Sequence, residues 1–241
     1  PYGDIIPGSE AGEEEFENYQ YAEMVESLSQ AIDDFILSGA ARIERGDGNK
    51  PCTMMINASH RWPVHKDIRD LVFEHVNQLN LTLQRHGISR PLEERLRQRW
   101  ESSFVPQVLA FNGIDDDGPQ DLILEGGGKS TDRPEKIIAH RLGSPNSRPP
   151  RTTEFNEILP FVTEFLEQIS SPNNHKILNS HTDDIVDYDA EPNLKAIIHG
   201  GYNLGRGLTF KGLVVAYMLR GHSDMSGLMQ MQRWCGYRSE N

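Results

Sequence analysis

The chain has 241 residues, of which 37% are hydrophobic and 25% charged, an ordinary composition for a globular protein with a buried core. At about 100–200 residues per domain, this length fits one large domain or a domain that carries an insertion. The formal net charge of −12 argues against a surface coated for non-specific nucleic-acid binding, and no apolar run approaches the roughly 20 residues that cross a bilayer.

The first 18 residues are predicted to be an acidic, solvated lead-in, since they contain the run Glu13–Glu15. They lack the basic start and apolar middle of a secretory signal. From Tyr19 to about Arg45, apolar residues recur at three- and four-residue steps, which predicts an amphipathic helix with one buried stripe. The segment Gly46–Asn49 ends this helix.

An apolar run from Cys52 to Ala58 predicts a strand covered on both faces, and the spacing from Ile68 to Leu79 predicts a second helix. Strand, turn and helix in this order favour an α/β domain with a parallel sheet. From residue 81 to residue 153 the apolar pattern of strands and helices is lost, and the sequence contains loop segments with Pro and Gly. We expect residues 81–153 to form an insertion or subdomain of helix and loop.

The α/β pattern then returns. A helix is predicted from Phe155 to Ile169, followed by short strands at His175–Asn179 and Leu194–His199. Leu213–Leu219 has the composition of the clearest buried strand in the chain, and a last helix is expected from about Asp224 to Trp234. Residues 19–80 and 154–241 are therefore predicted to form one parallel sheet flanked by helices.

The pattern with the clearest chemistry begins where the second of these short strands ends. Glycines at the carboxyl end of a parallel strand let the backbone approach a ligand closely, and ligands collect at that edge of an open sheet. A guanidinium between two glycines reaches a phosphate without neighbouring side chains in the way. The predicted nucleotide or nucleic-acid site consists of Gly200, Gly201, Asn203, Gly205, Arg206, Gly207 and Thr209.

The last predicted helix carries Gln230, Arg233 and Arg238, which we assign as catalytic residues. Arginines from two separate segments that converge on one edge suit the charge that develops during phosphoryl transfer. A lone Gly-Arg-Gly is often only a tight turn with a solvated Arg. The ordered set of strand, glycine-rich loop, strand and Gln/Arg helix arises less readily by chance, so we favour the functional interpretation.

This set resembles the fifth and sixth motifs of superfamily-two helicases, which lie on the second RecA-like lobe, a P-loop NTPase-like fold. More specifically, residues 199–238 resemble the Z1 (Z-one) domain family, described as endonucleases and found fused to helicase lobes in bacterial restriction-modification and DNA-processing systems. The chain departs from the family pattern at Tyr202, Gly205, Gln232 and Cys235. The change at Gln232 leaves open how closely the last helix approaches a phosphate.

The resemblance implies a RecA-like lobe of a larger helicase-like protein. ATP and Mg²⁺ would be bound mainly by an amino-terminal helicase lobe that this chain does not include, and nucleic acid, DNA more than RNA, would be a partner. Arg233 and Arg238 would close on the γ-phosphate, and Arg206 would couple closure to the nucleic-acid backbone. The chain begins without Met and stops just after a strong motif, so we expect a piece of a longer protein, inactive as an ATPase when isolated.

Two alternatives stay open. A metal-dependent endonuclease could use Asp183, Asp184 and Asp187 as metal ligands, although such a run is more often a solvated turn. A non-catalytic scaffold is the other. The glycine-rich run Glu125–Thr131 lacks the first glycine of a P-loop, so we interpret it as a flexible loop. The two cysteines are far apart in the chain and match no metal-ligand spacing, so free thiols in the cytoplasm are expected.

Overall fold

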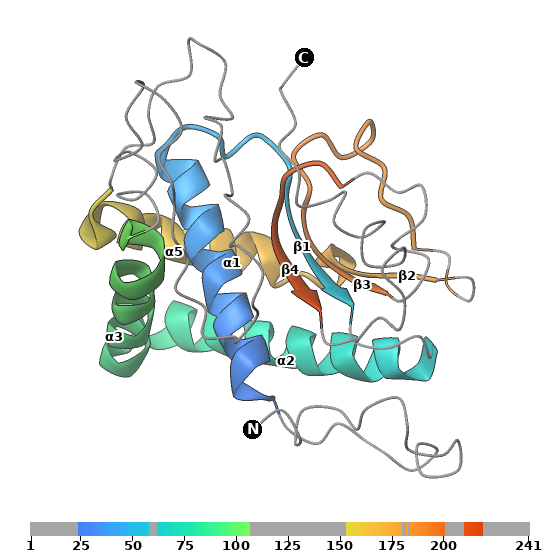
Figure 1. Ribbon diagram of the computed structural model, residues 1–241, viewed down its shortest axis with the longest axis horizontal. Helices are drawn as coiled ribbons and strands as arrows, with labels where there is room; N and C mark the ends of the chain where they lie inside the picture. Colours follow the sequence, from blue (N-terminus) through green and yellow to red (C-terminus); the bar gives the residue numbers. More distant parts are fainter. Residues whose placement is uncertain are drawn as a thin grey trace, which may run out of the picture.

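The computed structural model describes residues 24–57, 62–106, 153–179, 182, 184–200 and 210–218. Its described helices and strands follow one another in the order that the sequence predicted (Figure 1). The elements are α1 (Glu26–Glu44), β1 (Cys52–Asn57), α2 (Trp62–His86), α3 (Arg90–Arg99), a π-helical turn (Trp100–Phe104), α5 (Phe155–Ile169), a 3₁₀ turn (Pro172–Asn174), β2 (His175–Leu178), β3 (Lys195–Gly200) and β4 (Leu213–Met218).

The four strands form one sheet in the order β2-β3-β1-β4, and all neighbouring pairs are parallel. Helices flank it, so the predicted α/β class with a parallel sheet is confirmed, and the arrangement is compatible with a RecA-like lobe. Because the strands are parallel, their carboxyl ends share one edge, where Asn57, Leu178, Gly200 and Met218 lie. The arrowheads at this edge point toward the first half of α2 (Figure 1).

The larger hydrophobic core lies between the helices and one face of the sheet. Met54, Ile56 and Ile197 point from the sheet into this core and are at most 1% exposed. The rings of Phe35 on α1 and Phe165 on α5 meet edge to face, with centroids 5.1 Å apart. The opposite face of the sheet supplies a second, smaller cluster made of Met55, Leu178, Leu194, Ala196, Ile198 and Phe210.

The strand β4 differs from its prediction. Its apolar sequence predicted a fully buried strand, but in the structure five of its residues are half-buried and Ala216 is exposed. The reason is its place at the edge of the sheet, where β1 is the strand that pairs with it among the described residues. Just before it, Gly212 has a φ of 68° and its position leaves no room for a Cβ beside the Pro51 carbonyl, so only glycine fits there.

The helical region continues past the predicted start of the insertion. Residue 81 lies inside α2, which runs on to His86, and Gly87 with φ 72° then turns the chain toward α3. Two ion pairs join α3 to α1: Arg95 contacts Asp33 and Arg99 contacts Asp34. Residues 107–152 lie outside the described part of the chain. The division into domains therefore stays a prediction.

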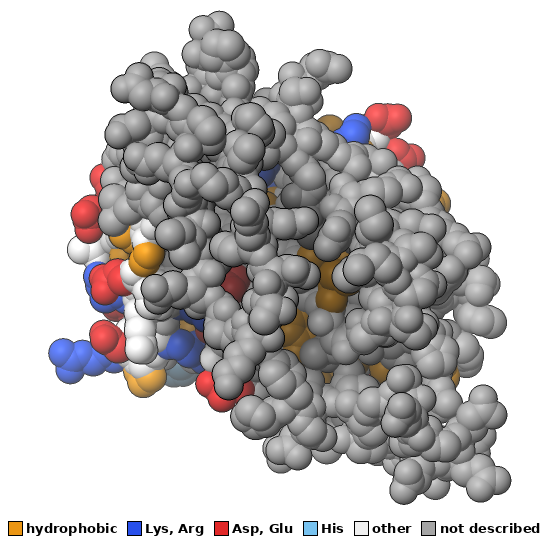
Figure 2. All heavy atoms as spheres, in the orientation of Figure 1, with side chains coloured by type: hydrophobic (Ala, Val, Ile, Leu, Met, Phe, Trp, Pro, Cys, Tyr) orange, Lys and Arg blue, Asp and Glu red, His pale blue; other side chains and the backbone are white. Residues whose placement is uncertain are grey.

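The described surface around α3 mixes acidic and basic side chains rather than presenting one sign of charge (Figure 2). Arg97, for example, forms an ion pair with Glu93 one turn away, with a distance of 2.9 Å between Nη2 and Oε1. Among the described helices, none combines the length and apolar character that spanning a bilayer requires.

Candidate site at the carboxyl edge of the sheet

The strand β3 sets where the glycine-rich segment begins. It lies between β2 and β1, with Gly200 beside Leu178 and His199 beside Ile56. Gly200 is the last residue of β3 and is buried. The segment that starts at Gly201 therefore leaves the sheet from the middle of its carboxyl edge and not from an outer strand.

Of the residues predicted for nucleotide or nucleic-acid binding and for catalysis, Gly200 alone belongs to the part of the chain that the structure describes. Its neighbourhood at the carboxyl edge is thus the observed portion of the site. The remaining predicted residues, which lie outside the described residues, are Gly201, Asn203, Gly205, Arg206, Gly207, Thr209, Gln230, Arg233 and Arg238. The expected convergence of their arginines stays a prediction.

The amino-terminal end of α2 belongs to the same edge. The strand β1 ends at Asn57, which is 1% exposed, and α2 begins at Trp62 after residues 58–61. The first turn of a helix carries backbone N–H groups without intrahelical partners and the positive end of the helix dipole. The β1–α2 connection was not among the predicted site residues, although its strand-turn-helix pattern is visible in the sequence.

Three buried histidines lie beneath this edge: His65 on α2, His175 on β2 and His199 on β3. We call them the histidine cluster; their exposed fractions are 4%, 2% and 1%. The rings of His175 and His199 stack with centroids 6.1 Å apart and an interplanar angle of 22°. His175 Nε2 lies 3.0 Å from the carbonyl oxygen of Ile169. Within the described part of the chain, neither ring nitrogen of His199 has a hydrogen-bond partner.

Burial keeps the imidazoles of His175 and His199 neutral. Loss of hydration lowers the pKa of His175 to about 4, although the contact with the Ile169 carbonyl acts in the opposite direction. For His199, burial lowers the pKa well below its usual value, and positive charge on His175, Arg69 or His65 would lower it further. At neutral pH the floor of the carboxyl edge is therefore uncharged at these two rings.

The sequence did not indicate the histidine cluster. His65 lies 110 residues before His175, which lies 24 residues before His199, and none of them forms a metal-binding pair such as His-Glu-x-x-His. Among the residues that the structure describes, no group of three or more His, Cys, Asp or Glu side chains is arranged to hold a metal ion. A hint was available only in retrospect, because His199 directly precedes the two glycines at the end of β3.

The carboxylates of Asp184 and Asp187, which follow β2, accept hydrogen bonds from nearby backbone amides. The carboxylate of Asp184 accepts a hydrogen bond of 2.7 Å from the amide of Ile177. Asp187 is exposed and accepts hydrogen bonds from the amides of Ala190 and Asp189, which lower the pKa of its carboxyl. Asp183 lies outside the described residues. These contacts fit a local structural role for Asp184 and Asp187 and add no support for the nuclease alternative.

Cys52 lies at the opposite, amino end of the sheet. Burial raises the pKa of its thiol to about 11, so the thiolate that would react is scarce at neutral pH. Nearby, Lys195 donates hydrogen bonds to the carbonyl oxygens of Gly48, Lys50 and Asn193. Burial in the core explains the Cys52 side chain, and the three backbone hydrogen bonds explain that of Lys195.

The family model of the Z1 domain matches residues 27–240, which is nearly all of the chain and contains every described element from α1 onward except the first residue of α1. The chain belongs to the Z1 domain family. Neither a curated protein nor a solved structure matches it significantly. The matched range of this Z1 domain includes residues 81–153, which the sequence analysis had set apart as an insertion.

Proposed function

We propose that this Z1 domain is the second RecA-like lobe of a helicase-type, DNA-handling ATPase and supplies arginines to a nucleotide site shared with another lobe. The observation that carries the proposal is the position of β3. An interior parallel strand that ends in Gly200 starts the glycine-rich Arg206 segment at the edge where open α/β sheets bind their ligands.

Three further features support this assignment. The Z1 family match covers the motif residues as well as the sheet that carries them. The start of α2 lies at the same edge, and the first turn of a helix suits phosphate oxygens because its backbone N–H groups have no intrahelical partners. The buried, neutral rings of His175 and His199 provide an uncharged floor, beside which a charge-assisted hydrogen bond from an arginine is stronger than in water.

In the proposed cycle, the partner lobe binds ATP and Mg²⁺, and this domain closes over the γ-phosphate with Arg233 and Arg238. Arg206 contacts the nucleic-acid backbone, so that nucleic acid and nucleotide both favour the closed arrangement. Hydrolysis removes the γ-phosphate charge that held the two arginines. The lobes then open. The Z1 resemblance favours DNA over RNA as the substrate.

The test is the ATPase activity of the full-length protein with Arg233→Ala. An arginine that stabilises the transferring phosphoryl group contributes about 10³–10⁵-fold to turnover, so we expect a loss of at least a hundredfold with nucleotide binding retained. Arg85→Ala is the matched control, because Arg85 is exposed at the end of α2, far from the carboxyl edge. Normal turnover in the Arg233 variant would reject the proposed role.

The alternatives give different results in the same protein. Cleavage of a plasmid with Mg²⁺ or Mn²⁺ that disappears on replacing Asp184 and Asp187 with Ala would identify a nuclease. Unchanged ATP hydrolysis and DNA translocation after replacing Arg206, Arg233 and Arg238 together would identify a scaffold.

A further inference from the structure

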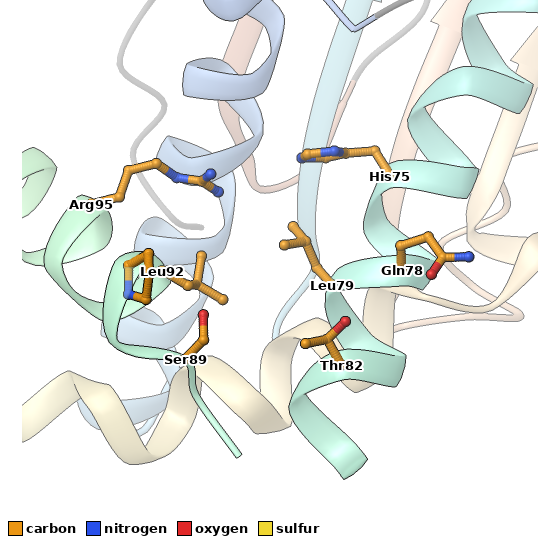
Figure 3. A pocket seen from close by; sticks show the side chains of 8 residues that line it. His75, Gln78, Leu79, Thr82, Ser89, Leu92 and Arg95 are labelled. Atoms are coloured by element: carbon orange, nitrogen blue, oxygen red, sulfur yellow. The ribbon is translucent and has the colours of Figure 1, made fainter. Parts of the chain in front are cut away.

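A cavity of about 400 Å³ opens between α2 and α3, away from the carboxyl edge of the sheet (Figure 3). Its walls come from the second half of α2 and the start of α3. From His65 in the histidine cluster to His75, the cavity residue nearest to it along α2, the helix advances about 15 Å at its usual rise per residue. The cavity is therefore separate from the proposed nucleotide site, and the inference drawn from it does not depend on that proposal.

One wall presents a guanidinium held in a fixed orientation. Arg95 contacts the carboxylate of Asp33 on α1 twice, through Nε at 2.8 Å and Nη2 at 2.9 Å. The Asp33 side chain is only 2% exposed, whereas that of Arg95 is 45% exposed. The ion pair thus anchors Arg95 from inside the protein through Nε and Nη2, and leaves Nη1 on the side of the guanidinium away from Asp33.

The opposite wall presents an imidazole. Figure 3 shows the ring of His75 and the guanidinium of Arg95 extending toward each other from the two helices. In the described part of the chain, His75 Nε2 lacks a hydrogen-bond partner and is buried, so the ring must turn slightly before this nitrogen can contact a ligand in the cavity. Burial, reinforced by the charge of Arg95, lowers the pKa of His75, so this ring is neutral at pH 7 and carries one N–H donor.

Below these two groups the cavity becomes apolar and then polar again. Leu79 from α2 and Leu92 from α3 project into the space beneath His75 and Arg95, and Thr82 and Ser89 place hydroxyls beyond them (Figure 3). The turn at Gly87 determines how α3 returns beside α2 and so sets the width between the walls. The volume falls within the range of about 300–1,000 Å³ that is typical of small-molecule sites.

We propose that this cavity binds a small carboxylate with an apolar body. The carboxylate lies between Arg95 and His75 and accepts hydrogen bonds from both, while the apolar body covers Leu79 and Leu92. Asp33 already balances the charge of Arg95, so recognition comes from oriented donors rather than from net positive charge. We therefore expect modest affinity, with a Kd on the order of 0.1–1 mM for a single-ring carboxylate.

The test uses 4-fluorobenzoate as the probe, with ¹⁹F NMR to follow its binding to the intact protein. The matched probes are 4-fluorobenzamide, which keeps the ring but removes the charge, and 4-fluorobenzylamine, which reverses it. Because charge-assisted hydrogen bonds are the stronger kind, we expect the benzoate to bind at least tenfold more tightly than either. Equal binding of benzoate and benzamide, or no saturable binding of benzoate, would overturn the proposal.

Variants then assign the contacts. His75→Leu should weaken benzoate binding about tenfold and leave benzamide binding nearly unchanged. Arg95→Ala would strand the buried carboxylate of Asp33, so the second variant is the double replacement Asp33→Asn with Arg95→Gln, which keeps a neutral hydrogen-bonded pair. Arg85→Ala is the control. Benzoate binding that survives in both wall variants, with circular dichroism showing a native fold, would also refute the carboxylate site.

Discussion

The contact between α1 and α5 and the contact of α2 with β2 and β3 lie on the same side of the sheet, but they are built from different side chains. The first is apolar: Phe35 packs on Phe165, and Gly39 lets the Phe165 ring approach the α1 backbone. The second contains the histidine cluster, with the ring of Phe73 against that of His175. Both interfaces are buried.

The two interfaces differ in how their contribution to stability depends on pH. Apolar packing stabilises the fold without depending on a protonation state. A buried imidazole stabilises it only while neutral, since an unpaired charge at that place costs several kcal/mol. Titratable groups buried under the carboxyl edge therefore lower stability at acidic pH. Such groups are typical of functional regions, and these lie beside the candidate site.

The largest effect is expected from a substitution that disrupts the apolar interface between α1 and α5. Phe165→Ala should lower the free energy of unfolding by about 4 kcal/mol, because it removes a fully buried ring and leaves a cavity. The loss should be the same at pH 7 and pH 5. Urea denaturation at both pH values measures it, and Phe161→Ala, at a half-buried position on the same helix, should cost clearly less. A strongly pH-dependent loss would contradict the comparison.

Acidification should break the other interface. The pKa of His175 is lowered from 6.5 in the unfolded chain to about 4 in the fold, so its contribution is fully present above about pH 6.5 and is lost as the pH falls toward 4. Between pH 7 and pH 4.5 this single group should remove stability of the order of 2 kcal/mol. Thermal or urea unfolding across this range provides the measurement.

Two variants separate the histidine cluster from other acid-sensitive groups. His199→Leu removes one buried ring that must stay neutral, so its stability should fall less steeply between pH 6.5 and pH 4 than that of the wild type. His86→Leu, at an exposed position at the end of α2, should leave the slope unchanged. Parallel slopes for wild type and the His199 variant would argue against an acid-sensitive cluster.

The smallest expected effect sharpens the description of the α1–α5 contact. Gly39→Ala should favour the helix by about 1 kcal/mol, but its Cβ would overlap the Phe165 ring, and overpacking costs about 1–3 kcal/mol. We expect a net loss of about 1 kcal/mol in unfolding experiments. Combining it with Phe165→Leu should give a smaller loss than the sum of the two single changes, since the overlap is relieved. Strict additivity would mean that the two positions do not meet.

Local patterns in the sequence were enough to predict most of the elements. Periodic apolar side chains gave the approximate positions of α1 and α5. The run from Cys52 to Ala58 predicted a strand, and the observed strand Cys52–Asn57 is buried along its whole length. Both signals depend on residues that are near one another in the chain, so they survive without knowledge of the fold. The order of strand, turn and helix in the first part of the chain also predicted the parallel α/β class.

The candidate site was predictable only up to its starting point. The glycines after residues 196–199 placed Gly200 at the end of a strand, which the structure confirms. The sequence did not show that β3 would lie in the middle of the sheet. It also did not show that α2 would start at the same edge. The meeting of Arg206 with Arg233 and Arg238 stays a prediction, because these residues lie outside the described part of the chain.

By itself, the sequence determined the α/β class, the kinds and approximate limits of most elements, and the motif by which the chain resembles the Z1 family. The tertiary structure alone decided that β4 is a half-exposed edge strand, that α3 is joined to α1 through Asp33 and Asp34, and that His65, His175 and His199 gather under one edge. Periodicity reflects which face of an element is apolar, whereas strand order and side-chain meetings depend on contacts between distant parts of the chain.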